Sequence, residues 1–165
     1  MRHEPNVLEK PLVGALSGFI ATIPMSIAMI AINKLMTWPH RQRLEPRKIT
    51  DDMLNRVGLR DELDEEDRKQ AAIAAHFAFG AAAGSLYPFV QRYIPASRSL
   101  RGPLYGLGVW AVSYCGVLPA LNTLPSPEKR PLGRTVLLVA AHLVWGAALE
   151  GAAETARRVS SQSGR

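Results

Sequence analysis

Hydrophobic and polar residues are segregated in long blocks along this chain. Four apolar stretches, each nearly free of charge, alternate with blocks that hold most of the charged residues. A soluble helical protein places polar residues along one face of each helix, and these stretches show no such face. A water-soluble Ala-rich bundle would need four helices apolar on nearly every side, more surface than a chain of 165 residues buries. The pattern therefore predicts an integral membrane protein.

We predict an all-α fold, an integral membrane four-helix bundle over residues 11–154, between polar tails at 1–10 and 155–165. The four predicted spans are residues 12–32, 71–90, 104–121 and 135–153. The first holds 21 uncharged residues. At about 1.5 Å per residue it covers roughly 30 Å, the thickness of the hydrocarbon core. Pro24 should kink this helix, which membrane helices tolerate, and residues 160–165 should be disordered.

The longest polar segment, residues 33–70, is expected to contain one short amphipathic helix. Thr50 is a favourable N-cap for it, because two aspartates follow in the first turn. Gly58 is a natural stop. Asp64 is expected to cap a second helix, with Asp67 at its third position, and this helix should continue into the second span.

The net charge is +6, which in a soluble protein would suggest a nucleic-acid surface. The sequence contains no RNA-binding, zinc-finger or helix-turn-helix pattern, so we expect the lipid bilayer and no nucleic acid as a partner. Basic loops that face anionic headgroups account for the charge. Lys and Arg number 12 in segments 33–70 and 122–134 and 8 elsewhere. The positive-inside rule therefore places these two segments in the cytoplasm, below an inner (plasma) membrane.

Signals for catalysis are missing from the sequence, which contains no nucleophile motif, P-loop, Rossmann fingerprint or paired catalytic carboxylates. We therefore predict that the protein is not an enzyme. The single cysteine, Cys115, excludes an intrachain disulfide and is interpreted as a small buried hydrophobe. Glu150 is expected near the headgroups, in a surface ion-pair cluster with Glu154, Arg157 and Arg158.

Small residues recur at four-residue spacing in every predicted span. Such stripes let helix backbones approach closely in a membrane, where lipid supplies no hydrophobic drive for association. They predict a tight bundle or the seam of a dimer. The glycines expected at helix contacts are Gly14, Gly18, Gly80, Gly84, Gly102, Gly106 and Gly146.

The chain also shows a weak internal repeat. Residues 74–82 read AAHFAFGAA and residues 140–148 read AAHLVWGAA. The segments Pro11–Gly14 and Pro103–Gly106 open the first and third spans in a similar way. The repeat predicts two pseudo-symmetric helix hairpins, related by an axis along the membrane normal.

Several segments occur in a distinctive order. After the Gly-rich first span come EPRKIT at 45–50, AHFAFGAAAG at 75–84, LYGLGVWAVSY at 104–114 and AAHLVWGA at 140–147. In this order the sequence resembles uncharacterised bacterial inner-membrane proteins of a YagU-like family, a domain of unknown function. The resemblance covers most of residues 11–150. It implies a helical inner-membrane protein and brings neither an activity nor functional residues.

His76 and His142 are the only ionisable residues well inside the predicted spans, and such residues suggest a function by default. In one interpretation each neutral ring stabilises the bundle by a hydrogen bond to a neighbouring helix, worth about 0.6 kcal/mol. In another, the two imidazoles are the axial ligands of a b-type haem. Binding of another ligand and proton relay are further alternatives. His3 and His40 lie in polar segments, so we predict no metal site.

The leading hypothesis is a structural protein or an accessory subunit of a membrane complex, without a cofactor, as a homodimer or within a larger assembly. The first alternative is a haem-binding electron-transfer or anchor subunit that uses His76 and His142. The second is a small dimeric transporter or channel, although the spans offer few polar residues to line a path.

Overall fold

The computed structural model describes residues 9–36 and 44–163, and within these two ranges it contains helices and no strand. The helices are α1 (Glu9–Leu35), α2 (Glu45–Arg56), α3 (Glu65–Val90), α4 (Arg98–Ala111), α5 (Leu118–Ala120) and α6 (Leu132–Ser163). Two 3₁₀ turns, η1 (Gln91–Tyr93) and η3 (Pro127–Lys129), and one π-helical turn, η2 (Val112–Val117), lie between them. The all-α prediction is therefore confirmed.

The ends of α2 and α3 follow local sequence signals. The Asp64 side chain accepts a hydrogen bond of 2.8 Å from the backbone N–H three residues on, which is the predicted cap of α3. The predicted start of α2 after Thr50 is wrong. This helix begins at Glu45, because Pro46 is pre-organised for a first turn and needs no N–H partner there. Gly58 follows the helix at φ +75°, a conformation that favours glycine.

Three helical segments are long and apolar enough to cross a membrane: residues 9–35, 65–93 and 132–159. Their outer faces carry large apolar side chains, such as Leu12 and Ile27 of α1, which are 68% and 62% exposed. These features indicate a membrane protein, because lipid tails suit such faces and water does not. The third predicted span, residues 104–121, is divided among α4, η2 and α5. These elements follow one another without interruption from residue 98 to residue 120.

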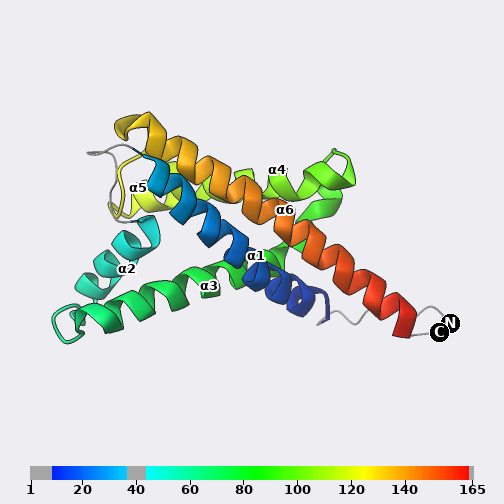
Figure 1. The fold of residues 1–165 in the computed structure, drawn as a ribbon, viewed down its shortest axis with the longest axis horizontal. Coiled ribbons are helices and arrows are strands. Elements are labelled where there is room, and N and C mark those ends of the chain that lie inside the picture. The colour runs from blue at the N-terminus through cyan, green and yellow to red at the C-terminus, as the bar shows by residue number, and fades with distance from the viewer. Residues whose placement is uncertain (1–8, 37–43, 164–165) are drawn as a thin grey trace.

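The long helices are arranged side by side in the order α3, α1, α6, α4. Figure 1 shows that they alternate in direction, so that the start of α1 and the end of α6 lie at one end of the molecule. Helix α2 and the segment between α5 and α6 lie at the other end. The central pair is joined by a hydrogen bond from the Trp145 indole N–H to the Gly18 carbonyl, 3.2 Å long. This arrangement leaves α3 and α4 at the two margins of the helix array.

Helices α3 and α4 meet at only one of their ends. Near the η1 turn the rings of Tyr87 and Tyr105 are 5.0 Å apart, and the Tyr105 hydroxyl donates to the Ala83 carbonyl at 2.7 Å. From there the two helices diverge, and α2 lies between their far ends (Figure 1). The divergence opens a V-shaped space between the two halves of the molecule.

Glycines bring the helix backbones of α1 and α3 into direct contact. A Cβ atom added to Gly18 would lie 2.2 Å from the Gly80 carbonyl oxygen and 2.8 Å from the Gly84 Cα atom. One added to Gly14 would lie 2.5 Å from the Gly84 carbonyl oxygen. No side chain fits at these distances, so only glycine permits this approach.

Helices α4 and α6 repeat the same kind of contact. A Cβ atom on Gly102 would lie 2.2 Å from the Gly146 carbonyl oxygen, and one on Gly106 would lie 2.1 Å from the His142 carbonyl oxygen. The sequence repeat aligns position 84 of α3 with position 150 of α6. Gly14 contacts position 84, whereas Gly106 contacts position 142. In the aligned repeat these two contacts are therefore eight residues apart, about 12 Å along the helix. The match between Pro11–Gly14 and Pro103–Gly106 therefore does not extend to equivalent packing positions.

Helix α6 continues beyond the predicted end of the fourth span. It remains helical to Ser163, so the predicted disorder is wrong for residues 160–163. Ion pairs support these turns, because Glu154 lies 3.0 Å from both Arg157 and Arg158 and 3.2 Å from Arg98 of α4. Opposite charges one turn apart stabilise a helix modestly.

Candidate ligand cavity between α3 and α4

The space between α3 and α4 is a cavity of about 910 Å³. Helices α1 and α6 form its rear wall through residues such as Met25 and Trp145, and α2 closes its wide end through Pro46 and Ile49. Most of the lining side chains are apolar. A concave apolar cavity of this size with a few polar groups is the usual form of a small-molecule site.

The cavity opens sideways, toward the surface that faces lipid. Leu86 on the α3 wall is 57% exposed and Val112 on the α4 wall is 66% exposed, although both line the cavity. A molecule dissolved in the bilayer therefore reaches the cavity without crossing an aqueous phase.

His142 lies in the rear wall and is 4% exposed. Its Nδ1 atom is 2.8 Å from the Leu138 carbonyl oxygen, so Nδ1 carries the proton and donates it to that oxygen. The Nε2 atom then holds a lone pair, and it has no hydrogen bond to any residue that the structure describes. The Tyr114 ring stands edge-on to this imidazole, with ring centroids 5.7 Å apart. A buried acceptor is therefore available to a ligand.

His76 lines the same cavity from the α3 wall. The structure thus brings the two predicted histidines to one site. The Nε2 atom of His76 is covered by surrounding atoms and has no partner among the described residues. A haem ligand must direct a nitrogen lone pair at the iron, and this covered nitrogen does not fit that requirement unless the ring turns. The volume of the cavity is therefore compatible with a large cofactor such as haem, whereas the orientation of the His76 ring is not.

The π-helical turn η2 brings two hydroxyl groups to the α4 wall. Ser113 and Tyr114 both line the cavity, and neither hydroxyl has a hydrogen-bond partner within the described ranges. π-helical turns occur frequently at functional sites. Sequence reasoning did not identify this pair. The available signal was a serine beside a tyrosine inside an otherwise apolar run.

Cys115 follows this pair on the same turn. It is exposed and does not line the cavity, so its interpretation as a buried hydrophobe is wrong. The change of helical pitch in η2 rotates the residues around it, which a regular helical pattern does not predict. Within the described residues, no three His, Cys, Asp or Glu side chains are grouped as a metal ion would need.

Glu150 forms a separate polar network near the narrow end of the cavity. Its carboxylate accepts hydrogen bonds from the Tyr87 hydroxyl and, at 2.9 Å, from Arg157. Glu150 is only 7% exposed, so its predicted place in a surface cluster is wrong, although the pairing with Arg157 is present. The sequence contains no local signal for the partner on α3, which lies 63 residues away.

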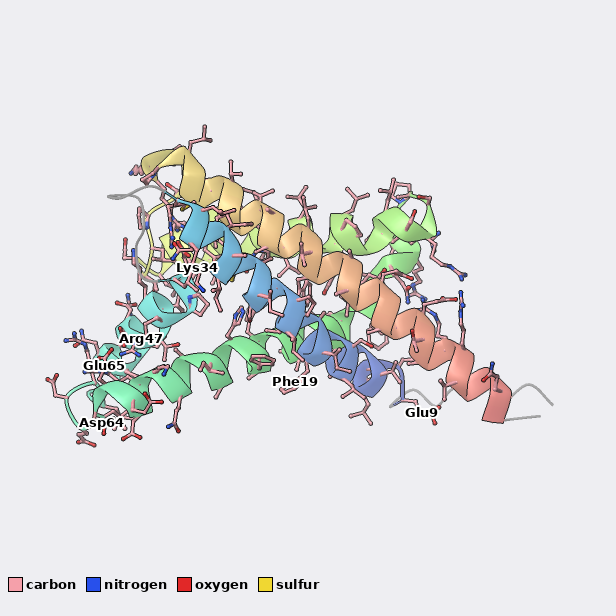
Figure 2. The ribbon with its side chains drawn as sticks, in the orientation of Figure 1. Glu9, Phe19, Lys34, Arg47, Asp64 and Glu65 are labelled. Atoms are coloured by element: carbon pink, nitrogen blue, oxygen red, sulfur yellow. The ribbon has the colours of Figure 1, made fainter. Side chains whose placement is uncertain are left out.

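Polar contacts hold α2 across the wide end of the cavity. Arg134 of α6 donates to the Glu45 carboxylate at 2.6 Å, and both side chains are almost fully buried. On the other side, Arg47 lies 2.9 Å from Glu65 at the start of α3. Both residues are labelled in Figure 2. Figure 2 also labels Glu9 and Lys34, which mark the two ends of α1. Helix α2 therefore connects the two diverging walls.

The outer end of α2 is held by a third set of contacts. Asp52 accepts hydrogen bonds from Arg56 at 2.7 Å and from the Thr123 hydroxyl at 2.9 Å. Arg56 also donates to the Leu121 carbonyl at 2.7 Å. The hydrogen bond from Arg56, with a smaller contribution from Thr123, holds the pKa of Asp52 below its usual value.

Comparison with known proteins gives one match. A family model described as "Protein of unknown function (DUF1440)" matches residues 38–151, which include α2 to α5 and most of α6. The chain therefore belongs to this family, and the expected membership of a domain-of-unknown-function family is confirmed. No curated protein and no solved structure matches the chain.

Proposed function

We propose that this member of the DUF1440 family is a four-span membrane protein that binds an amphiphilic small molecule between α3 and α4. The span that this proposal adds, the third in chain order, runs from residue 98 to residue 120, about 35 Å of helix at about 1.5 Å per residue. The protein would be non-enzymatic, located in the inner membrane, and would act as an accessory subunit that holds or presents its ligand.

One observation carries this proposal: three polar groups on the lining of a mostly apolar cavity have no partner among the described residues. The lone pair of His142 Nε2, the Ser113 hydroxyl and the Tyr114 hydroxyl all lack a hydrogen bond to the described part of the chain. A buried polar group without a partner costs about 1–3 kcal/mol. Groups that serve only helix packing would be paired across the interface, as the Trp145 indole is.

The polar groups define the chemistry of the ligand. A ligand hydroxyl would donate to His142 Nε2, and a ligand carbonyl would accept from Ser113 or Tyr114. The apolar walls and the lateral opening suit a long hydrocarbon body that remains in the bilayer. These features together favour a lipid-soluble molecule with a hydroxyl or carbonyl head, such as an isoprenoid quinone.

The b-type haem remains the second candidate, because His76 and His142 line one cavity. It requires the His76 ring to turn so that a nitrogen faces the iron. A membrane-soluble ligand without a metal requires no such change, so we place it first.

Native mass spectrometry of the protein, released from membranes in mild detergent, tests the proposal. We expect one retained molecule per chain, and loss of most of it in Tyr114→Phe, which removes only the hydroxyl. Tyr93→Phe is the matched control, since Tyr93 is 72% exposed on η1, outside the cavity. Retention that is equal in both variants, or no retained molecule in the unmodified protein, would refute the proposal.

An absorption spectrum of the same sample separates the two candidates. A Soret band with sharp α and β bands after dithionite reduction, lost in His142→Ala, would replace the amphiphile with haem. A flat visible spectrum, together with a retained organic molecule, would support the amphiphile.

A further inference from the structure

A second, smaller cavity lies where α2, the segment before α6 and the start of α6 meet. Its volume is about 140 Å³, and four cationic side chains and one carboxylate line it. We propose that it binds a phosphate oxyanion, supplied by the headgroup of an anionic phospholipid. The charged side chains that line it are Lys48, Lys129, Arg130, Arg134 and Glu45.

Two of these charges neutralise each other. Arg134 is 3% exposed and donates to Glu45 Oε1 through two nitrogens, at 2.6 and 3.1 Å, and to the Asn33 side chain at 2.8 Å. This ion pair forms one wall of the cavity. The lining also carries the positive charges of Lys129 and Arg130.

Arg130 is the group that points to an anion. Its Nε atom donates to the Pro125 carbonyl at 2.6 Å, and its guanidinium lies over the Tyr114 ring, 5.2 Å from the centroid. These contacts fix the side chain, but its Nη2 atom is buried and has no partner among the described residues. Burial lowers the pKa of Arg130, the direction expected for a cation removed from water. A phosphate oxygen would supply the missing acceptor with a charge-assisted bond.

One group opposes an anion in this cavity. Glu45 Oε2 is buried and has no hydrogen-bond partner within the described ranges. The phosphate must therefore sit toward Lys129 and Arg130, away from this oxygen. Glu128 is not part of the lining, and its carboxylate accepts a hydrogen bond of 2.5 Å from the Ser126 hydroxyl.

The position of the cavity favours a lipid as the source of the phosphate. Residues of α2 and of the start of α6 line the cavity. Figure 1 shows these elements at the end of the molecule where α1 ends. These helix ends are the ends of predicted spans, so they lie at the depth of the headgroups. Basic pockets between helices at this level bind anionic headgroups.

The test uses the full-length protein in lipid nanodiscs and measures retained lipid by native mass spectrometry. We expect phosphatidylglycerol to be retained in preference to phosphatidylcholine, and its affinity to fall about tenfold in Arg130→Gln, as loss of a charge-assisted bond predicts. Lys129→Gln provides a second variant with an exposed side chain, in case Arg130→Gln does not fold. Arg92→Gln is the matched control, because Arg92 is exposed and lies on η1 at the other end of the molecule.

A competition experiment identifies the source of the phosphate. If inorganic phosphate displaces phosphatidylglycerol from the unmodified protein but not from Arg130→Gln, the site takes the oxyanion alone. If only the lipid binds, the proposal stands in full. Equal retention of phosphatidylglycerol in the unmodified protein and both cavity variants, or an equal loss in Arg92→Gln, overturns the site.

Discussion

The interface between α1 and α3 and the cleft between α3 and α4 differ in how closely their residues pack and in whether their polar groups are paired. In the interface, Gly18 and Gly80 bring backbones into contact and leave no room for an added atom. In the cleft, Gly108 has nothing within 4 Å of where a side chain would begin, and the Ser113 and Tyr114 hydroxyls have no hydrogen-bond partner among the described residues. Close packing in which polar groups are paired, as the Thr22 hydroxyl is with the Gly18 carbonyl, is typical of a structural contact, whereas open space with unpaired polar groups is typical of a binding site. Packing density and the pairing of polar groups therefore distinguish the structural interface from the candidate binding site.

The largest effect is expected from removing the ion pair that fixes α2 across the cleft. Arg134→Ala leaves the buried Glu45 carboxylate without its cation, which costs about 3–5 kcal/mol of stability. Thermal unfolding in detergent would measure the loss. Arg56→Ala is the control, since Arg56 pairs with Asp52 near the surface, and such pairs contribute about 0–1 kcal/mol. Similar losses in both variants would contradict the structural role of the buried pair.

A single glycine substitution distinguishes the two regions directly. Gly18→Ala places a methyl group 2.2 Å from the Gly80 carbonyl oxygen and should cost about 1–3 kcal/mol. Gly108→Ala places the same group in open space and should stabilise its helix by up to about 1 kcal/mol. The opposite signs are the expected result in unfolding experiments. A loss of stability of equal size in both variants would mean that the cleft is as closely packed as the interface.

The smallest effect concerns pH at the outer end of α2. The pKa of Asp52 lies below its usual value of 3.8, so its contribution to stability is full above that value and is lost as the pH falls further. The protection factors of the α2 amides, which correct for the intrinsic exchange rate at each pH, should therefore fall under strongly acidic conditions. Asp52→Asn should remove this dependence while the glycine-packed helices keep theirs. An unchanged acid response in Asp52→Asn would show that another group is responsible.

Local signals predicted much of the fold. The apolar stretches that became α1, α3 and α6 can be recognised from the residues of each stretch alone. The same holds for the Asp64 cap of α3. The glycine stripes also indicated which faces pack, because close approach has few solutions. The start of α2 was missed because Thr50 and Pro46 both qualify as start signals, and the pattern does not rank them.

The candidate site was predicted only in part. His76 and His142 stood out because ionisable residues are rare in apolar spans, and they do line one cavity. Ser113 and Tyr114 were missed because the π-helical turn that brings them to the cavity breaks the regular helical period. The pairing of Tyr87 with Glu150 joins segments 63 residues apart, and no periodicity within either helix specifies it.

The helix array also has a mechanical consequence. Glycine contacts join α1 to α3 and α4 to α6, so we treat each pair as a rigid unit. The two units meet along α1 and α6. Helix α3 has 26 residues, so a tilt of about 5° between the two units would move the far end of α3 by about 3 Å. Helix α2 connects the two units across the cleft, because Glu45 forms an ion pair with α6 and Arg47 forms one with α3. We therefore expect the width of the cleft to depend on two ion pairs that lie more than 10 Å from the histidines at about 1.5 Å per residue.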